Sequence, residues 1–80
     1  MIEVTMPKWG LTMEYATMGP WRKQEGDLVT EGEVLAEVMT EKITNELESP
    51  VTGRLVRIYI AAGEEEVPVG EPLCLIQPGK

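Results

Sequence analysis

Among the basic residues of this chain, Lys42 has the most unusual neighbours in the sequence. It is the only Lys or Arg between Lys23 and Arg54. The same window holds these carboxylates: Glu25, Asp27, Glu31, Glu33, Glu37, Glu41, Glu46 and Glu48. On composition alone, an isolated lysine of this kind is a solvated charge that helps solubility. A further role for Lys42 therefore needs independent evidence.

Other side chains that could carry chemistry are few. The chain has no histidine, so the usual proton shuttle at neutral pH is missing. The single cysteine, Cys74, excludes an intramolecular disulfide and any multi-cysteine metal site. It lies in the apolar run 72–76, which predicts a buried structural thiol rather than a nucleophile. There is no glycine-rich phosphate loop. We therefore expect no catalytic group and no metal site, and a carrier or binding module rather than an enzyme.

Length and charge narrow the class further. Eighty residues form one domain with a modest core. Fourteen acidic residues face seven basic ones, and the net charge of −7 disfavours binding to nucleic acid or to an anionic membrane. No segment has the length and apolarity of a membrane span, and no cleavable signal precedes the first candidate strand. We expect a cytoplasmic protein, or one of an organelle matrix if a presequence was removed.

Glycines and prolines divide the chain into segments of strand length rather than helix length. The candidate strands are residues 2–6, 15–21, 28–29, 34–39, 43–47, 53–60, 67–69 and 73–76. Short strands separated by regular turn signals predict a β-sandwich or barrel. Val56, Ile58 and Ile60 alternate with Arg57 and Tyr59, which predicts that the three aliphatic side chains face inward.

The two halves of the chain are similar to each other. Segment 32–38 matches 70–76 at an offset of 38, and segment 16–26 matches 53–63 at an offset of 37. One extra residue within 64–66 accounts for the difference. Each half supplies about four strands and cannot close a core alone. We therefore expect an all-β domain, a flattened β-barrel or sandwich of two four-stranded sheets with pseudo-twofold symmetry (a barrel-sandwich hybrid).

The repeat also predicts the position of Lys42 in the domain. An offset of 37 pairs Lys42 with Thr5, beside the N-terminus. The turn that carries Lys42 and the paired chain ends should therefore lie at opposite poles of the domain.

The turn itself has an unusual sequence. It falls between segments 34–39 and 43–47, so that Glu41-Lys42 should form a hairpin tip. Two-residue hairpin turns prefer Asn-Gly or Asp-Gly, because their central residues need positive φ. The turn is therefore of a more permissive type, or it is centred on Thr44-Asn45. A tip that departs from the easiest turn sequence indicates a constraint beyond folding.

Two other features bear on the fold. Gly19-Pro20 falls inside segment 15–21, where a proline forfeits a ladder hydrogen bond, so this strand should be at an edge or bulged there. Residues 77–80 are either a natural terminus or the start of a linker, and residues 1–80 form a single domain.

The motif around Lys42 resembles a known one. Met39-Thr40-Glu41-Lys42-Ile43, followed by Glu46-Leu47-Glu48-Ser49-Pro50-Val51-Thr52-Gly53, is similar to the lipoyl attachment motif of the dihydrolipoamide acyltransferase components of 2-oxo acid dehydrogenase complexes. In that family the modified lysine follows an acidic residue at the tip of a β-turn. The family's glycines sixteen residues before and eleven residues after the lysine fall on Gly26 and Gly53. Segments 6–13 and 67–73 also fit, so the resemblance covers essentially the whole chain. Glu41 stands where Asp is more usual, and Met39 where many members have Glu.

The resemblance implies a lipoyl domain, with lipoate joined covalently to Lys42 and with Glu41, Gly26 and Gly53 as further motif residues. It implies a swinging-arm carrier with no catalytic site of its own. Its partners would be a lipoate ligase or lipoyl transferase, a thiamine-dependent 2-oxo acid decarboxylase, an acyltransferase core and a dihydrolipoamide dehydrogenase. Because Gly53 follows a turn and opens a strand, we also expect it to need a special conformation or a close backbone approach.

Three alternatives stay open at this point. Biotin carrier domains also modify a hairpin lysine, but their lysine usually lies between two methionines, whereas Lys42 lies between Glu41 and Ile43. Glycine-cleavage carriers are usually longer. An unmodified barrel that serves only as an interaction module would not require a lysine at this tip.

Overall fold

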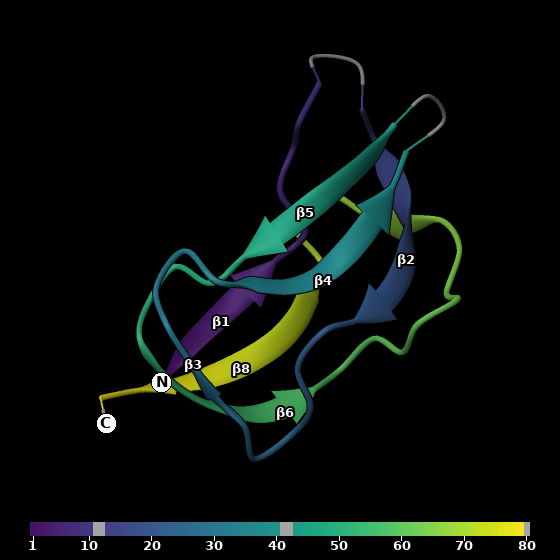
Figure 1. Ribbon diagram of the computed structural model, residues 1–80. Coiled ribbons are helices and arrows are strands. Elements are labelled where there is room, and N and C mark those ends of the chain that lie inside the picture. Colours follow the sequence, from purple (N-terminus) through teal and green to yellow (C-terminus); the bar gives the residue numbers. More distant parts are fainter. Residues whose placement is uncertain (11–12, 41–42, 80) are drawn as a thin grey trace.

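The computed structural model describes residues 1–10, 13–40 and 43–79, and within these ranges every regular element is a strand (Figure 1). The strands are β1 Ile2–Thr5, β2 Tyr15–Trp21, β3 Leu28–Val29, β4 Val34–Met39, β5 Thr44–Glu48, β6 Gly53–Ile58, β7 Val67–Pro68 and β8 Pro72–Pro78. Each predicted strand is present, with bounds that differ by a few residues at most. No helix in the described ranges is long and apolar enough to cross a membrane.

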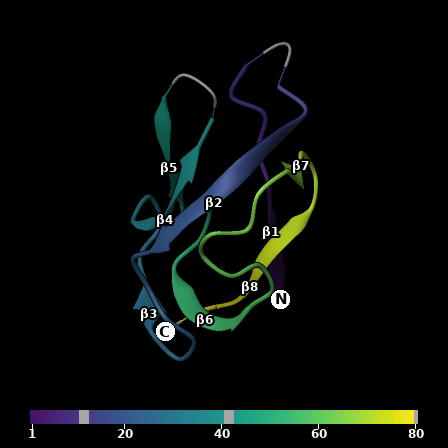
Figure 2. The same ribbon diagram turned by 90° about the vertical axis from the view of Figure 1, so that its right-hand side faces the viewer.

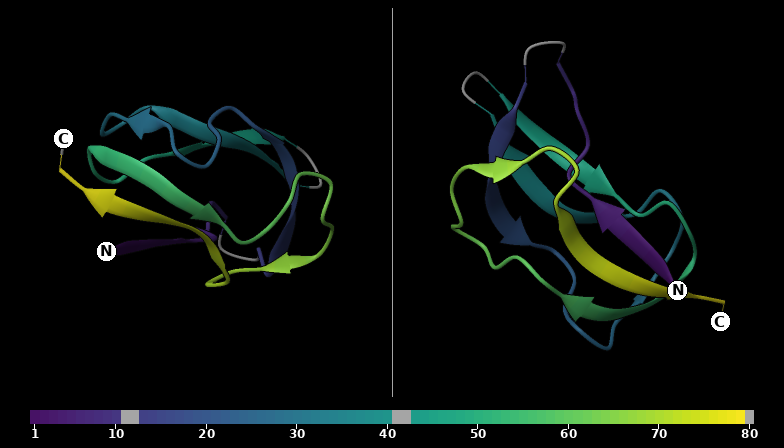
Figure 3. Two further views of the ribbon diagram at one scale, coloured as in Figure 1. Left: turned by 90° about the horizontal axis from the view of Figure 1, so that it is seen from below. Right: turned by 180° about the vertical axis from the view of Figure 1, so that it is seen from behind.

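The strands form two four-stranded antiparallel sheets, in the orders β1-β8-β6-β3 and β5-β4-β2-β7. Figure 3 shows the sheets as two layers, one above the other. Within the described ranges no strand pair joins the two sheets. The predicted flattened barrel or sandwich of two four-stranded sheets is confirmed in its sandwich form, since within the described residues the two sheets are not closed into a barrel.

The two sheets are related by the repeat that the sequence predicts. Strands β1, β8, β6 and β3 of one sheet correspond in order to β5, β4, β2 and β7 of the other. The turns correspond as well: Gly26 N–H donates to the Leu55 carbonyl at 2.7 Å, and Gly63 N–H donates to the Met18 carbonyl at 2.8 Å. Both glycines have a left-handed backbone, with φ of 97° and 92°. The pseudo-twofold symmetry is therefore confirmed down to single hydrogen bonds.

The extra residue of the second half also has a structural counterpart. Val29 pairs with Gly53, and in the other sheet Ala16 pairs with Val67. Relative to the glycine turns that precede these strands, the second connection is one residue longer. It contains Glu66, whose φ of 55° is the one positive value outside glycine among the described residues. The insertion within 64–66 is thus accommodated by a left-handed residue.

Each half carries a β-bulge at the same place. The register of β2 shifts between Met18 and Trp21, as the Gly19-Pro20 pair predicts, although β2 is an interior strand rather than an edge. The register of β6 shifts between Leu55 and Arg57.

The second bulge overturns one sequence prediction. Leu55 is fully buried and Val56 is 37% exposed, so the expectation that Val56 faces inward is wrong. Because a bulge adds a residue, the alternation changes phase there. Ile58 and Ile60, further along, do pack against the core.

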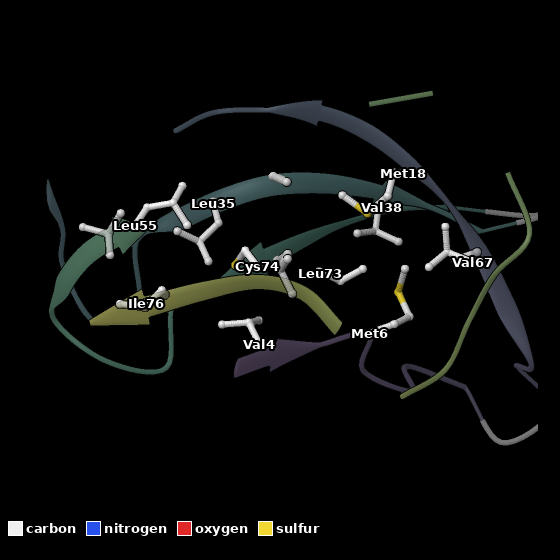
Figure 4. Packing of buried hydrophobic residues seen from close by; sticks show 14 residues of the cluster. Val4, Met6, Met18, Leu35, Val38, Leu55, Val67, Leu73, Cys74 and Ile76 are labelled. Carbon is white, nitrogen blue, oxygen red and sulfur yellow. The ribbon is translucent and has the colours of Figure 1, made fainter. Parts of the chain in front are cut away.

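The core fills the space between the sheets (Figure 4). Its largest fully buried side chains are Met6, Met18, Leu35, Leu55, Leu73, Ile76, Val29, Val38 and Cys74. Burial raises the pKa of the Cys74 thiol to about 12. The predicted buried, structural cysteine is confirmed.

Candidate functional site

The hairpin that joins β4 and β5 positions the candidate attachment site. Met39 pairs with Thr44, and Val38 pairs with Asn45. Thr40 N–H then donates to the Ile43 carbonyl at 2.8 Å. The turn therefore lies between Thr40 and Ile43. A turn centred on Thr44-Asn45 is excluded, because both residues belong to β5 and are paired with residues of β4. Glu41 and Lys42 fall between these flanks and lie outside the described residues.

Thr40 fastens this hairpin with its side chain as well as with its backbone. Its hydroxyl donates to the Ile43 carbonyl at 3.0 Å and accepts from the Ile43 N–H at 3.4 Å. Both backbone polar groups of Ile43 are therefore held by one residue across the turn. Sequence reasoning missed this role, although a threonine beside a turn is a known competitor for local backbone groups.

The hairpin lies at one pole of the domain. Figure 1 shows the ends of β4 and β5 pointing away from the N- and C-termini, which lie near each other at the opposite pole. This confirms the predicted opposition. The repeat gives the reason, because β4 and β5 correspond to β8 and β1, and the place equivalent to the hairpin is where the chain begins and ends.

An open groove with a mixed polar and apolar lining lies beside the hairpin. It has a volume of about 380 Å³ and is lined by Tyr15, Ala16, Thr17, Met39 and Thr40. Tyr15 is 56% exposed and Met39 is 39% exposed. In Figure 2 the described parts of the connection between β1 and β2 extend toward the pole at which β4 ends and β5 begins. The surroundings of the site thus include exposed hydrophobic side chains that take no part in the core.

The described cations near the hairpin strands are engaged in ion pairs. Arg22 pairs with Glu37, and the Lys23 ammonium lies 3.0 Å from a Glu33 carboxylate oxygen. The Thr30 N–H and Lys23 lower the pKa of the Glu33 carboxyl.

Gly53 makes the close backbone approach that its place in the sequence predicts. A Cβ built on it would lie 2.1 Å from the Gln77 carbonyl oxygen. Its φ is not positive, so the requirement for glycine comes from contact and not from conformation. Gly53 pairs with Pro78 at the end of β8, beside the C-terminus.

Gly26 lies near the same part of the molecule. Its N–H bonds to Leu55, and its carbonyl accepts a bond from the Arg54 guanidinium. Gly26 therefore lies beside β6, the strand that Gly53 begins. The structure does not bring the two glycines to the β4–β5 hairpin.

The described residues contain no group of three or more His, Cys, Asp or Glu side chains placed to hold a metal ion. The described surroundings of the candidate site are the β4–β5 hairpin, the neighbouring groove and the carboxylates of Glu33 and Glu37.

Comparison with known proteins identifies relatives along almost the whole chain. The family model Biotin_lipoyl, described as "Biotin-requiring enzyme", matches residues 2–76. The dihydrolipoyllysine-residue acetyltransferase component of the mitochondrial pyruvate dehydrogenase complex of Caenorhabditis elegans is 42% identical over 73 residues, which are 91% of this chain and 14% of that protein. The corresponding component of the acetoin cleaving system of Pseudomonas putida is 39% identical over 77 residues, 96% of this chain and 20% of that protein.

A third relative belongs to another component. The pyruvate dehydrogenase E1 component subunit beta of Rhizobium meliloti (strain 1021) is 42% identical over 80 residues, covering 99% of this chain and 17% of that protein. This chain thus spans a fifth or less of the length of these relatives. Among solved structures, the lipoyl domain of the 2-oxoglutarate dehydrogenase complex from Azotobacter vinelandii aligns over 100% of both chains with a TM-score of 0.80 and 24% identity, which shows a shared fold.

Proposed function

Since this chain belongs to the biotin/lipoyl family as a lipoyl domain similar to those of acyltransferase components, we propose that its Lys42 is the lipoyl attachment residue. The observation that carries the proposal is the hairpin geometry. Thr40 and Ile43, which flank Lys42 in the sequence, are hydrogen-bonded to each other where β4 ends and β5 begins, at the pole opposite the chain ends. A group attached there points away from anything that is tethered at the termini.

The residues present fit a lipoyl group joined through an amide. When bound, the group supplies a dithiolane that takes up and releases an acyl group and two electrons. The chain itself contributes position, because Thr40 holds Ile43 from across the turn. The tether adds effective concentration, because the carried group reaches each partner without diffusing away.

The proposed partners follow from the relatives. The names of the relatives refer to pyruvate dehydrogenase complexes and acetoin cleaving systems. We infer that this domain visits a thiamine-dependent 2-oxo acid decarboxylase, an acyltransferase core and a dihydrolipoamide dehydrogenase, and that a lipoate ligase or lipoyl transferase modifies it. The net charge of −7 suits electrostatic selection of partners, which changes association rates more than affinity. The compartment would be that of the complex, the bacterial cytoplasm or an organelle matrix.

The test is modification of the chain by a defined enzyme. The chain is co-expressed with a lipoate ligase and lipoate, then analysed by intact mass and peptide mapping. We expect one lipoyl increment, on Lys42, which is lost in Lys42→Arg and retained in Lys23→Arg. The second variant is a matched control because it makes the same substitution at another lysine, Lys23, which forms an ion pair. A lipoyl increment on Lys8 or Lys23 would contradict the proposal, and a biotinyl increment from a biotin ligase would favour the biotin carrier alternative.

A further inference from the structure

The five methionines of this chain, all of them in the described ranges, differ widely in their exposure to solvent. Met6 and Met18 are 1% and 0% exposed and belong to the core, and Met13 is partly buried against it. Met1 and Met39 are 69% and 39% exposed. Apart from the first residue, Met39 is therefore the methionine that a small solute reaches most readily.

The position of Met39 in the sheet gives it polar neighbours close to the hairpin. It is the last residue of β4, and Thr40, whose side chain fastens the hairpin, follows it. Its register partners are Thr17 of β2 and Thr44 of β5. Register partners in antiparallel strands carry their side chains on the same face. Met39 thus has a side chain with a hydroxyl group beside it on each neighbouring strand.

These surroundings suit the sulfoxide that a peroxide forms from an exposed methionine. The thioether sulfur takes one oxygen atom from hydrogen peroxide: the O–O bond breaks, an S–O bond forms, and water leaves. The sulfur loses the two electrons that the peroxide gains. The new oxygen is a hydrogen-bond acceptor, for which the hydroxyl groups of Thr17 and Thr44 are donors. The single thiol, Cys74, is buried and does not compete for the oxidant.

We propose that Met39 is a site of reversible oxidation to the sulfoxide, and that the oxidised form slows the enzyme that modifies Lys42. The inference rests on the proposed function, because Met39 lies three residues before the proposed attachment residue. An enzyme that brings its reacting atoms to the hairpin also covers the neighbouring groove, whose lining includes Met39. Covering a sulfoxide removes water from a strong acceptor, a cost that the thioether does not carry. A methionine sulfoxide reductase reverses the step, because two thiols become a disulfide and the oxygen leaves as water.

The first test measures where oxygen is added. The unlipoylated domain is treated with dilute hydrogen peroxide, and the sulfoxides are followed in time by intact mass and peptide mapping. We expect Met1 and Met39 to be oxidised first, and Met6 and Met18 to be oxidised about tenfold more slowly or less, because susceptibility follows exposure. Oxidation of Met39 as slow as that of Met18 would overturn the proposal.

The second test measures the initial rate at which a lipoate ligase modifies Lys42, before and after the same treatment. In the parent, we expect oxidation to slow the rate roughly fivefold, the low end of what burying an unpaired polar group costs. A methionine sulfoxide reductase with a dithiol should restore the rate. Met39→Leu is the matched control, because it keeps the exposed Met1 at the opposite pole, and its rate should be the same before and after treatment. Met39→Gln, with a polar side chain of similar length, should be slow without any oxidant.

Three results would overturn the proposal. An oxidised parent that is modified as fast as the untreated one would show that the sulfoxide has no effect, and a Met39→Leu variant slowed equally by peroxide would place the effect at another residue. Urea unfolding of the oxidised parent should match that of the untreated domain, because Met39 is not part of the core; a lower midpoint would attribute the slower rate to unfolding instead. Failure of the ligase to modify Lys42 in the untreated parent would contradict the proposed function, so the two failures are distinguishable.

Discussion

Gly53→Ala should be one of the most damaging single-methyl changes in this domain. The added Cβ would lie 2.1 Å from the Gln77 carbonyl oxygen and 2.9 Å from both the Gln77 carbonyl carbon and the Pro78 Cα. Every one of these atoms belongs to the backbone, so no flexible side chain can turn away. The two strands must separate by about 1 Å to reach a contact distance that real Cβ atoms show.

The magnitude follows from what that separation disturbs. Forcing a methyl group into a closely packed contact costs about 1–3 kcal/mol. The register pairs Gly53 with Pro78 and Arg54 with Gln77, so opening this end of the β6–β8 ladder loses about one further hydrogen bond, near 1 kcal/mol. The total of about 2–4 kcal/mol is a large share of the roughly 5 kcal/mol expected for a domain of this size. At about 4–8 °C for each kcal/mol, the melting temperature should fall by roughly 10–30 °C.

The assay is urea unfolding of three alanine variants. Gly10→Ala meets no atom within 4 Å and has no left-handed backbone, so it should stay within about 0.5 kcal/mol of the parent. Gly63→Ala also meets open space but has a φ of 92°, which should cost about 1–2 kcal/mol. The expected order of destabilisation is Gly53, Gly63, Gly10. If Gly53→Ala unfolded together with Gly10→Ala, the argument from backbone contact would be refuted.

Three other predictions concern the hairpin and the core. Thr40→Val should slow modification of Lys42 severalfold with little change in unfolding temperature, and Thr40→Ser should restore the rate, because the hydroxyl makes both side-chain bonds to Ile43; an unaffected valine variant would refute this. The double variant Glu41→Lys, Lys42→Ala should not be lipoylated in the mass assay, because it moves the ε-amine away from the fixed position that the modifying enzyme requires; full modification would contradict it. Burial raises the pKa of Cys74 from 9.0 to about 12, so stability should be constant below pH 9 and fall as the pH rises toward 12 in urea titrations, and the folded protein should not react with a thiol reagent at pH 8; rapid labelling would show that the thiol is accessible.

Much of the fold could be predicted from sequence because the repeat and the turn glycines are local signals. Glycines at 26 and 63 recur at an offset of 37, and both adopt the left-handed backbone that makes glycine necessary. The strands between such turns are short, so the positions of the turn glycines nearly determine where each strand begins and ends. Whether the two sheets close into a barrel could not be predicted in this way, because closure depends on pairing between edge strands that are far apart in the chain.

The error at Val56 has a different cause. Alternation of hydrophobic residues assumes an unbroken strand, and a bulge changes its phase. The information was nevertheless present in the repeat. Gly19-Pro20 predicts a bulge in the first half, and an offset of 37 transfers it to Val56-Arg57, where the register of β6 does shift.

The candidate site was only partly predictable. The motif predicts Lys42 as the attachment residue, and its described flanks, Thr40 and Ile43, are bonded to each other as a hairpin tip requires. The side-chain bonds of Thr40 leave no separate mark in the sequence, since threonine is also an ordinary strand residue. The groove leaves none either, because its lining comes from two strands that are separate in the sequence.

The two poles of the domain differ, although the pseudo-twofold symmetry relates their strands. Thr17 pairs with Met39 at the hairpin pole, and the equivalent residues Arg54 and Gln77 pair at the pole of the chain ends. The residue before Thr17 is Ala16, whose side chain is buried in the core, whereas the residue before Arg54 is Gly53.

At the pole of the chain ends the strands approach so closely that no Cβ fits at Gly53. At the hairpin pole the same position accommodates a methyl group and leaves a groove beside it. The repeat gives both poles the same arrangement of strands. The strands approach closely at the pole of the chain ends, and they leave a groove at the pole of the hairpin, where the arm would be attached. Substitution of Gly53 should therefore change stability, and substitution of Thr40 at the hairpin should change the modification of Lys42.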